Sequence, residues 1–525
     1  MPVHKLVGGG PPPATHDLID SRIGIHDSNH FEVKLDYSID PKLDQTRYRV
    51  ETYFFVPRSL GINSYTYSRE QFYSDIQAYI RFKTPQASLG SLCEEDNRLS
   101  PLARLAKMVP KVLKDPRRED YLNQISYDLR LVGCLIRANL RDRVTTQCER
   151  LEAANGDPAR RAAVVDDVRA SGRRLIAELE AVVTRFRELR PALLDPVLPA
   201  WLRETHQYVD EYLSLASETH LTRLVEQIDH HAELRPALEE VRQKARDRLL
   251  AEREHRRGSG YPSVLDGGGS REHFVYRQGL LKKFVMSVLF LEISKEKEGR
   301  RIADLGAAIA AGLAMLVATV AGVFAQQRYG LNTWPFVVAL VVSYMLKDRL
   351  KDWLKLYFSA KMTRFLADYD VRIHDPLHGV NIGRCREAFS FIGKEKVPSE
   401  VLSFRHRDSK TMIETSGKPE VVMKYEKEIT LLGSSIANLD DLHHDINDII
   451  RFDISQFLVR TDDPVAAVPA YQVETDRVEL VECPKVYHIN VVFVLRAQTG
   501  EAGRVTMERI RVILDKRGIR KLEQA

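Results

Sequence analysis

The sequence predicts an α+β membrane protein. A two-helix transmembrane hairpin is expected in the middle of the chain. A cytoplasmic region that combines strands with a helical bundle precedes it, and a C-terminal α+β domain with a mostly antiparallel sheet follows it. Three observations lead to this prediction. Two uncharged apolar runs, 305–327 and 329–346, follow each other closely. Apolar residues recur at helical spacing through most of 102–256, and they alternate with polar residues in several segments after residue 370.

The N-terminal part of the chain divides into a tail and a strand-rich segment. Residues 1–28 contain Gly and Pro runs and no apolar stretch of the signal-peptide kind, so we expect a flexible tail. Within 29–90, apolar and polar residues alternate at 31–38 and 47–56, where aromatic and β-branched residues are frequent; this predicts strands. The stretch 71–82 fits either a short helix or a further strand.

A helical bundle is predicted over residues 91–256. Apolar residues form one helical face in 121–144, and in 165–189 they recur at alternating steps of three and four, a heptad seam that Gly172 interrupts. A further helical pattern over 221–249 has the spacing to fold back along this seam. We therefore expect an intramolecular bundle; the alternative is that a helix of a partner protein completes the seam.

A Gly-rich linker follows the bundle. Residues 257–270 include GSGYPSVLDGGGS, the clearest linker pattern in the chain. The segment 271–302 has a helical pattern that leads into the first apolar run, which predicts a juxtamembrane helix. Its own apolar stretch, FVMSVLFLEI, is too short to span a bilayer.

Residues 303–346 carry the predicted transmembrane hairpin. Each uncharged run reaches the roughly 18–20 residues that a helix needs to cross about 30 Å of hydrocarbon. Gly330 breaks the helix between the runs, and Pro335 falls in the first turn of the second. Aromatic residues expected at the two membrane interfaces are Tyr329, Trp334, Tyr344, Trp353 and Tyr357. The alternative is a buried hairpin of a soluble domain, because the apolar centre of the second run, PFVVALVV, is short.

Residues 347–370 predict a basic amphipathic helix on the anionic cytoplasmic leaflet. Its basic residues are Lys347, Arg349, Lys351, Lys355, Lys361 and Arg364. The alternative is that the second membrane helix continues and packs its apolar stripe on the protein's own domains. Basic residues also precede the first run, and the loop between the runs is nearly uncharged, so both termini are expected in the cytoplasm. High Ala and Arg usage favours a bacterial inner membrane.

Small residues recur at four-residue spacing in the first run. They are Ala308, Gly312, Ala318 and Gly322. Such spacing allows close approach of another helix, either the second helix of the hairpin or a second protomer in a homo-oligomer. Neither run contains an ionisable side chain, whereas transport paths usually do. The hairpin is therefore expected to anchor the protein or transmit a signal.

The C-terminal segment 371–525 predicts a cytoplasmic α+β domain. Strands are expected where apolar and polar residues alternate: 401–407, 420–432, 449–460, 485–496 and 503–514. Short helices are expected at 383–392 and 438–448.

Two His/Asp sets are the strongest candidates for chemistry. IHDPLHG contains His374, Asp375 and His378, and LHHDIND contains His443, His444 and Asp445. Imidazole and carboxylate groups together are able to hold a metal ion and position a water. A turn rich in Asp, Pro and Gly, and a solvated helix start, explain the two sets equally well. The five cysteines have no CxxC spacing, and no cofactor fingerprint is present, so we expect no cofactor.

These observations favour a non-enzymatic function. The chain has 78 Lys and Arg against 73 Asp and Glu, well mixed, so nucleic acid is not an expected partner. We expect a two-pass membrane-tethered scaffold, sensor or assembly factor whose partners are the lipid bilayer and another protein. The first alternative is a membrane-bound metal-dependent hydrolase that uses the His/Asp sets. The second is a subunit of an oligomeric pore or transporter.

Overall fold

The computed structural model describes residues 19–524 except 40–42, 155–157, 266–270, 297–298, 331–332, 363–366, 408–419, 438, 440–444, 474–475 and 499–503. The chain forms two compact units. The β unit comprises residues 1–80, 291–437 and 445–525, and the helical unit comprises 81–290 and 438–444.

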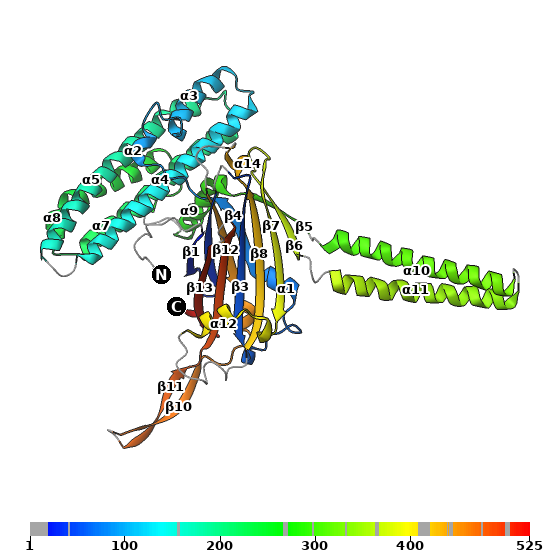
Figure 1. Ribbon diagram of the computed structural model, residues 1–525. Helices are drawn as coiled ribbons and strands as arrows, with labels where there is room; N and C mark the ends of the chain where they lie inside the picture. The colour runs from blue at the N-terminus through cyan, green and yellow to red at the C-terminus, as the bar shows by residue number, and fades with distance from the viewer. Residues whose placement is uncertain are drawn as a thin grey trace. The chain divides into compact units, whose positions relative to one another are not determined.

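Long helices make up most of the helical unit (Figure 1): α4 (Glu119–Ala153), α5 (Pro158–Glu188), α7 (Ala200–His230) and α8 (Arg235–Gly258). Shorter elements are α2 (Leu89–Leu92), α3 (Pro101–Lys114), α6 (Arg190–Leu193), α9 (Arg271–Met286) and the 3-10 turn η2 (Ser287–Leu289). α4 packs against α7, and α8 packs against both α5 and α7. The heptad seam of α5 is thus completed within the chain.

Most strands of the β unit form two sheets. The strands are β1 (Ile19–Ile25), β2 (His30–Ser38), β3 (Gln45–Pro57), β4 (Ile76–Phe82), β5 (Glu292–Glu296), β6 (Tyr369–His374), β7 (Asn381–Ile392), β8 (Glu420–Leu432), β9 (Asp445–Asp453), β10 (Val465–Gln472), β11 (Arg477–Pro484), β12 (Tyr487–Gln498), β13 (Arg504–Asp515) and β14 (Gly518–Gln524). One sheet has the order β14-β13-β12-β3-β8-β7-β6-β5 and the other β1-β2-β9-β4, while β10 and β11 form a separate ribbon.

Strands that are distant in sequence are neighbours in both sheets. β3 lies between β8 and β12, as Figure 1 shows, and β2 pairs with β9. Segments 29–90 and 371–525, which the sequence pattern separates, therefore contribute to the same sheets. The pairs whose register is described are antiparallel, as expected.

Both faces of the eight-stranded sheet are covered. On one face, Val401 of α12 (Ser399–His406) packs in a cluster with Tyr53 and Phe55 of β3. On the other face, Phe54 of β3 lies with its ring centroid 5.1 Å from that of Phe452 of β9, which joins the two sheets. Further short elements are η1 (Arg58–Leu60), α1 (Arg69–Asp75), η3 (Lys394–Lys396), α14 (Gly433–Ala437) and α15 (Ser455–Leu458).

Most predicted strands are confirmed, but several other assignments are wrong. Part of the flexible tail expected over 1–28 is strand β1, which pairs with β2. Segments 31–38, 47–56, 420–432, 485–496 and 503–514 correspond to β2, β3, β8, β12 and β13, and 71–82 is α1 followed by β4. The predicted strand 401–407 is α12, whose position is decided by packing on the sheet. The predicted helix 383–392 is β7, where burial of Glu387 hides the alternation of strand residues. The predicted strand 449–460 is β9 up to Asp453 and α15 beyond it.

The helices expected at 438–448 and 271–302 also differ from the structure. Most of 438–448 lies outside the described residues, and β9 begins at Asp445. In 271–302, α9 ends at Met286, and the chain continues through η2 into the edge strand β5.

The prediction of a two-helix transmembrane hairpin is wrong. Residues 303–329 lie in α10 (Gly299–Tyr329) and 334–346 in α11 (Trp334–Met362). Among the described helices, only α10 is long and apolar enough to cross a membrane. α10 includes Tyr329, and α11 begins only at Trp334. Its uncharged part ends at Leu346 and reaches only about 20 Å at 1.5 Å per residue. One such helix does not establish a membrane protein, and the fold class is mixed α+β with antiparallel sheets.

Candidate functional site

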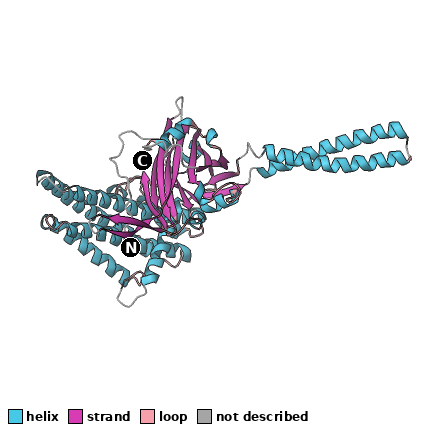
Figure 2. Cartoon of the chain, turned by 90° about the horizontal axis from the view of Figure 1, so that it is seen from below, coloured by secondary structure: helices cyan, strands magenta, loops and turns pink. Residues whose placement is uncertain are grey.

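The hairpin of α10 and α11 is inserted between two paired strands. It follows β5 and precedes β6, which pair in antiparallel register with Glu296 opposite Asp370. The hairpin therefore takes the place of an ordinary β-turn, and the sheet holds both of its ends together. α10 and α11 lie side by side, as Figures 1 and 2 show.

The turn between the two helices is set by Gly330 and Thr333. Gly330 has a φ of +71°, which glycine adopts without steric cost. Its N–H donates to the carbonyl of Gln326 at 3.2 Å and ends α10. The Thr333 hydroxyl donates to the carbonyl of Tyr329 at 2.9 Å, and the carbonyl of Thr333 accepts from the N–H of Val337 at 3.1 Å at the start of α11.

Small residues of α10 face α11. Among the α10 residues whose burial is described, three alanines are buried: Ala310, Ala314 and Ala325. Of the small residues singled out in the sequence, Ala318 and Gly322 are half-buried, whereas Ala308 and Gly312 are exposed. A β-carbon at Gly312 would meet nothing within 4 Å, so this glycine is not required for packing within the hairpin.

Two contacts align the helices along their length. The Ser343 hydroxyl donates to the carbonyl of Ala318 at 3.2 Å. A β-carbon at Gly322 would lie 3.7 Å from Leu340 Cδ1. Because the helices run in opposite directions, residues from Lys347 onward lie beside α10 residues that precede Ala318 and are still apolar. The part of the hairpin near its turn is therefore uncharged in both helices except for Arg328, which precedes the turn.

We call this part the hairpin tip and define it as residues 315–327 of α10 and 334–346 of α11. Only 11% of the apolar stretch of α10 is buried. Met315, Leu316 and Val317 are 57, 60 and 54% exposed, although successive residues of a helix point about 100° apart. Apolar side chains are thus exposed all around the tip, except where α10 and α11 pack against each other.

Aromatic residues lie in and beside the tip, and basic residues follow it on α11. The aromatic residues predicted at membrane interfaces are all exposed: Tyr329, Trp334, Tyr344, Trp353 and Tyr357. Arg349, Lys351 and Lys355 are exposed on α11. The Lys347 ammonium lies 3.6 Å from the centroid of the Tyr344 ring. The side chain of Lys361 and all of Arg364 lie outside the described residues.

Asp375 and His378 close a turn. The Asp375 carboxylate accepts from the main-chain N–H of His378 at 2.9 Å, and its Oδ2 lies 2.6 Å from His378 Nδ1. The N–H of Gly379 donates to the carbonyl of Asp375 at 2.9 Å, which completes the turn. These hydrogen bonds give the pair a local structural role.

Among the described residues, the other members of the His/Asp sets form no metal site with Asp375 and His378. His374 ends β6 and Asp445 begins β9, while His443 and His444 lie outside the described residues. Within the described part of the chain, no group of three or more His, Cys, Asp or Glu side chains is placed to hold a metal ion. The hydrolase alternative stays a prediction, as does the pore alternative.

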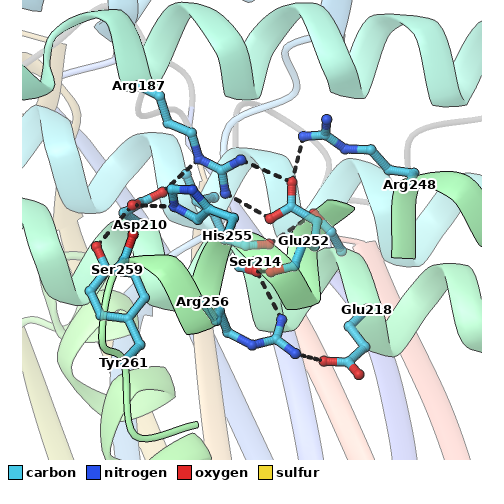
Figure 3. Close-up of polar contacts among 12 residues, drawn as sticks. Arg187, Asp210, Ser214, Glu218, Arg248, Glu252, His255, Arg256, Ser259 and Tyr261 are labelled. Carbon is cyan, nitrogen blue, oxygen red and sulfur yellow. Dashed lines mark hydrogen bonds and ion pairs between the residues drawn. The ribbon is translucent and has the colours of Figure 1, made fainter. Parts of the chain in front are cut away.

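A cluster of buried charges in the helical unit was not anticipated from the sequence (Figure 3). Arg187 of α5 bridges two carboxylates. Its Nε donates to Asp210 of α7 at 2.9 Å, and its Nη2 donates to Glu252 of α8 at 2.7 Å. His255 Nε2 lies 2.8 Å from Asp210 Oδ2, and the Tyr261 hydroxyl donates to the same oxygen at 2.9 Å. One cluster thus joins three helices and the loop after α8.

Arg256 extends this cluster along α7. Its Nη1 donates to the Ser214 hydroxyl at 2.8 Å, and its Nε donates to the carbonyl of Ser263 at 3.1 Å. Its Nη2 pairs with the carboxylate of Glu218. Ser214 in turn donates to the carbonyl of Glu252 at 3.1 Å. The end of α8 and the residues before the linker are therefore fastened to α7.

The cluster is suited to structure rather than to nucleophilic catalysis. Burial tends to raise the pKa of Asp210, but the hydrogen bond from His255 and the charge of Arg187 outweigh it and hold that pKa well below its usual range. The Ser259 hydroxyl accepts from Arg190 at 3.0 Å, and within the described residues it has no hydrogen bond to His255. His255 is therefore not paired with a nucleophile.

The sequence itself does not mark this cluster. The structure shows that residues 209–217 of α7 are buried on every side, so Asp210 is a charge within a fully buried helix segment. A charge in such a segment requires a partner.

Comparison with protein-family models, with curated proteins and with solved structures finds no match for this chain. The hairpin tip, whose apolar side chains are exposed, is the strongest candidate for a functional site.

Proposed function

We propose that the chain is a non-enzymatic scaffold that attaches to a lipid bilayer through the hairpin tip. The observation that carries the proposal is the exposure of apolar side chains around the tip. Removal of apolar surface from water is favourable by about 25 cal/mol per Å². Soluble monomers rarely leave a large contiguous apolar patch in water, so a partner is expected to cover this one.

A lipid bilayer fits the tip better than a protein groove does. A groove covers one side of a helix, whereas hydrocarbon covers every side, and successive residues such as Leu316 and Val317 are exposed in different directions. The tip, about 20 Å long, enters the hydrocarbon without the second helix crossing it, and Arg328 at the turn is the charge that enters with it. Trp353 beyond the tip adds an apolar ring with a polar N–H, which suits the interface where the tip enters.

The scaffold part of the proposal concerns a protein partner. β10 and β11 form an isolated ribbon in which Tyr471, Val478 and Leu480 are exposed. A two-stranded ribbon is marginally stable alone in water, so apolar side chains on it favour a protein that packs against it.

Vesicle flotation of the full-length chain tests the lipid attachment. Wild-type protein is expected to float with phosphatidylcholine vesicles. Phe324→Asp combined with Val341→Asp places two charges on the exposed tip, each costing about 2–3 kcal/mol in hydrocarbon. The partition coefficient between vesicles and water, calculated from the fraction of protein that floats, is expected to fall at least a hundredfold.

A matched control separates the tip from general surface apolarity. Val478→Asp with Leu480→Asp changes two residues of the ribbon that are 67 and 72% exposed, and it is expected to float like wild type. Wild-type protein that stays at the bottom of the gradient as a soluble oligomer would overturn the proposal, as would flotation of the tip variant.

A further inference from the structure

Three lysines of α11 lie on one face close to the hairpin tip. Lys347, Lys351 and Lys355 are four residues apart, so their side chains follow one another along the helix. Lys351 and Lys355 are exposed and make no hydrogen bond or ion pair within the described residues. Lys347 lies over the Tyr344 ring and 3.7 Å from Asp348. We call these three residues the lysine stripe.

The surroundings of the lysine stripe are amphipathic. Trp353 and Tyr357 are also four residues apart, lie on another face of α11 and are exposed. The stretch 347–357 contains four basic and two acidic residues and is therefore net positive. Indole and phenol rings beside ammonium groups, next to an uncharged apolar tip, match the order of headgroup and hydrocarbon layers in a bilayer.

We propose that the lysine stripe binds the headgroups of anionic phospholipids, so that the hairpin selects an anionic bilayer surface. This inference rests on the proposed attachment of the tip to lipid. With the tip in hydrocarbon, the alignment of the two helices brings Lys347 and Lys351 to the headgroup layer, because they lie just beyond the uncharged part of α11. Each basic residue near an anionic surface strengthens binding about fivefold.

Binding of the full-length chain to two kinds of vesicle tests the inference. The vesicles contain phosphatidylcholine alone or phosphatidylcholine mixed with phosphatidylglycerol. Wild-type protein is expected to bind the anionic vesicles at least tenfold more tightly at low salt, and added NaCl is expected to reduce this preference by screening. The variant Lys347→Gln/Lys351→Gln/Lys355→Gln is expected to lose the preference and still bind phosphatidylcholine.

A control variant has the same change in net charge elsewhere. Lys396→Gln/Lys516→Gln/Lys521→Gln changes lysines of the β unit and is expected to keep the wild-type preference. Equal wild-type binding to both vesicles, or a preference that persists in the stripe variant, would overturn the inference and leave the tip attachment standing. Failure to bind either vesicle would overturn the attachment itself. Stripe-dependent binding to soluble polyglutamate that exceeds binding to anionic vesicles would assign the stripe to an acidic protein instead.

Discussion

His206 of α7 is buried, and its imidazole ring makes no hydrogen bond among the described residues. Its ring stacks on Phe186 with centroids 5.0 Å apart, and neither ring nitrogen has a partner within the described residues. Burial lowers the pKa of His206 to about 4, and the positive charges of Arg190, Arg187 and His255 act in the same direction, while Asp210 opposes them. The folded helical unit therefore holds this imidazole neutral.

The helical unit is expected to lose stability as the pH falls from about 6.5 to 4. The folded pKa of His206 lies below the unfolded value of 6.5, so the unfolded state binds more protons in this range. The contribution of His206 falls by about 2 kcal/mol between pH 7.5 and 5. Urea titrations at both pH values, with hydrogen exchange in α7 as the probe of unfolding, measure this change.

His206→Leu separates this effect from other titrating groups. The variant retains an apolar side chain beside Phe186 and has no imidazole to protonate, so its stability is expected to fall less with pH than that of wild type. An equal fall in both proteins would show that His206 does not titrate as described.

At the scale of single elements, glycine sets the distance between helices. A β-carbon at Gly172 of α5 would lie 2.7 Å from Val241 Cγ1 of α8, closer than atoms normally approach. Gly172 interrupts the heptad seam of α5 because α8 lies directly against that position. Gly279 of α9 is different, because a β-carbon there would meet nothing within 4 Å.

Alanine at these two glycines is expected to have opposite effects. Gly172→Ala should destabilise the helical unit by about 1–3 kcal/mol through overpacking against Val241. Gly279→Ala should stabilise α9 by up to about 1 kcal/mol, because alanine favours a helix. Urea denaturation of the full-length variants measures both. Val241→Ala in the Gly172→Ala background should recover stability, and equal behaviour of the two single variants would contradict the described packing of α5 on α8.

At the scale of the whole chain, a buried ion pair joins the two sheets of the β unit. Lys427 of β8 and Asp448 of β9 are fully buried, and the Lys427 ammonium lies 2.6 Å from Asp448 Oδ2. Burial tends to lower the pKa of Lys427, but the negative charge of Asp448 outweighs it and raises that pKa. The Tyr37 hydroxyl of β2 donates to the same carboxylate at 3.3 Å. The two charges therefore stabilise each other only when both sheets are in place.

Breaking this pair is expected to cost more than replacing it. Lys427→Met leaves Asp448 buried without its cation and should lower the free energy of unfolding by about 3–5 kcal/mol. Lys427→Met with Asp448→Leu removes both charges and should be closer to wild type. Urea denaturation followed by intrinsic fluorescence gives the coupling energy between the two positions. Additive effects of the two substitutions would contradict the pairing.

How much the sequence predicted depended on whether a pattern was local. Strands with clear alternation, such as β3 and β12, were predicted correctly because alternation reflects which face is buried. β7 was not, because its buried Glu387 is held within 4 Å of Lys427 and Lys295, partners far away in the sequence. The Arg187–Asp210–Glu252 cluster was not predicted from the sequence for the same reason, because its members come from three helices.

By itself, the sequence determined the positions of the apolar runs and of most helices and strands, because the spacing of apolar residues along the chain reflects which side of an element is buried. Only the tertiary structure decided that segments before and after the hairpin share both sheets. It also decided that α11 becomes charged where the adjacent part of α10 is still apolar. That alignment depends on where the Gly330 turn ends one helix and starts the next, and it makes the uncharged tip shorter than a bilayer crossing.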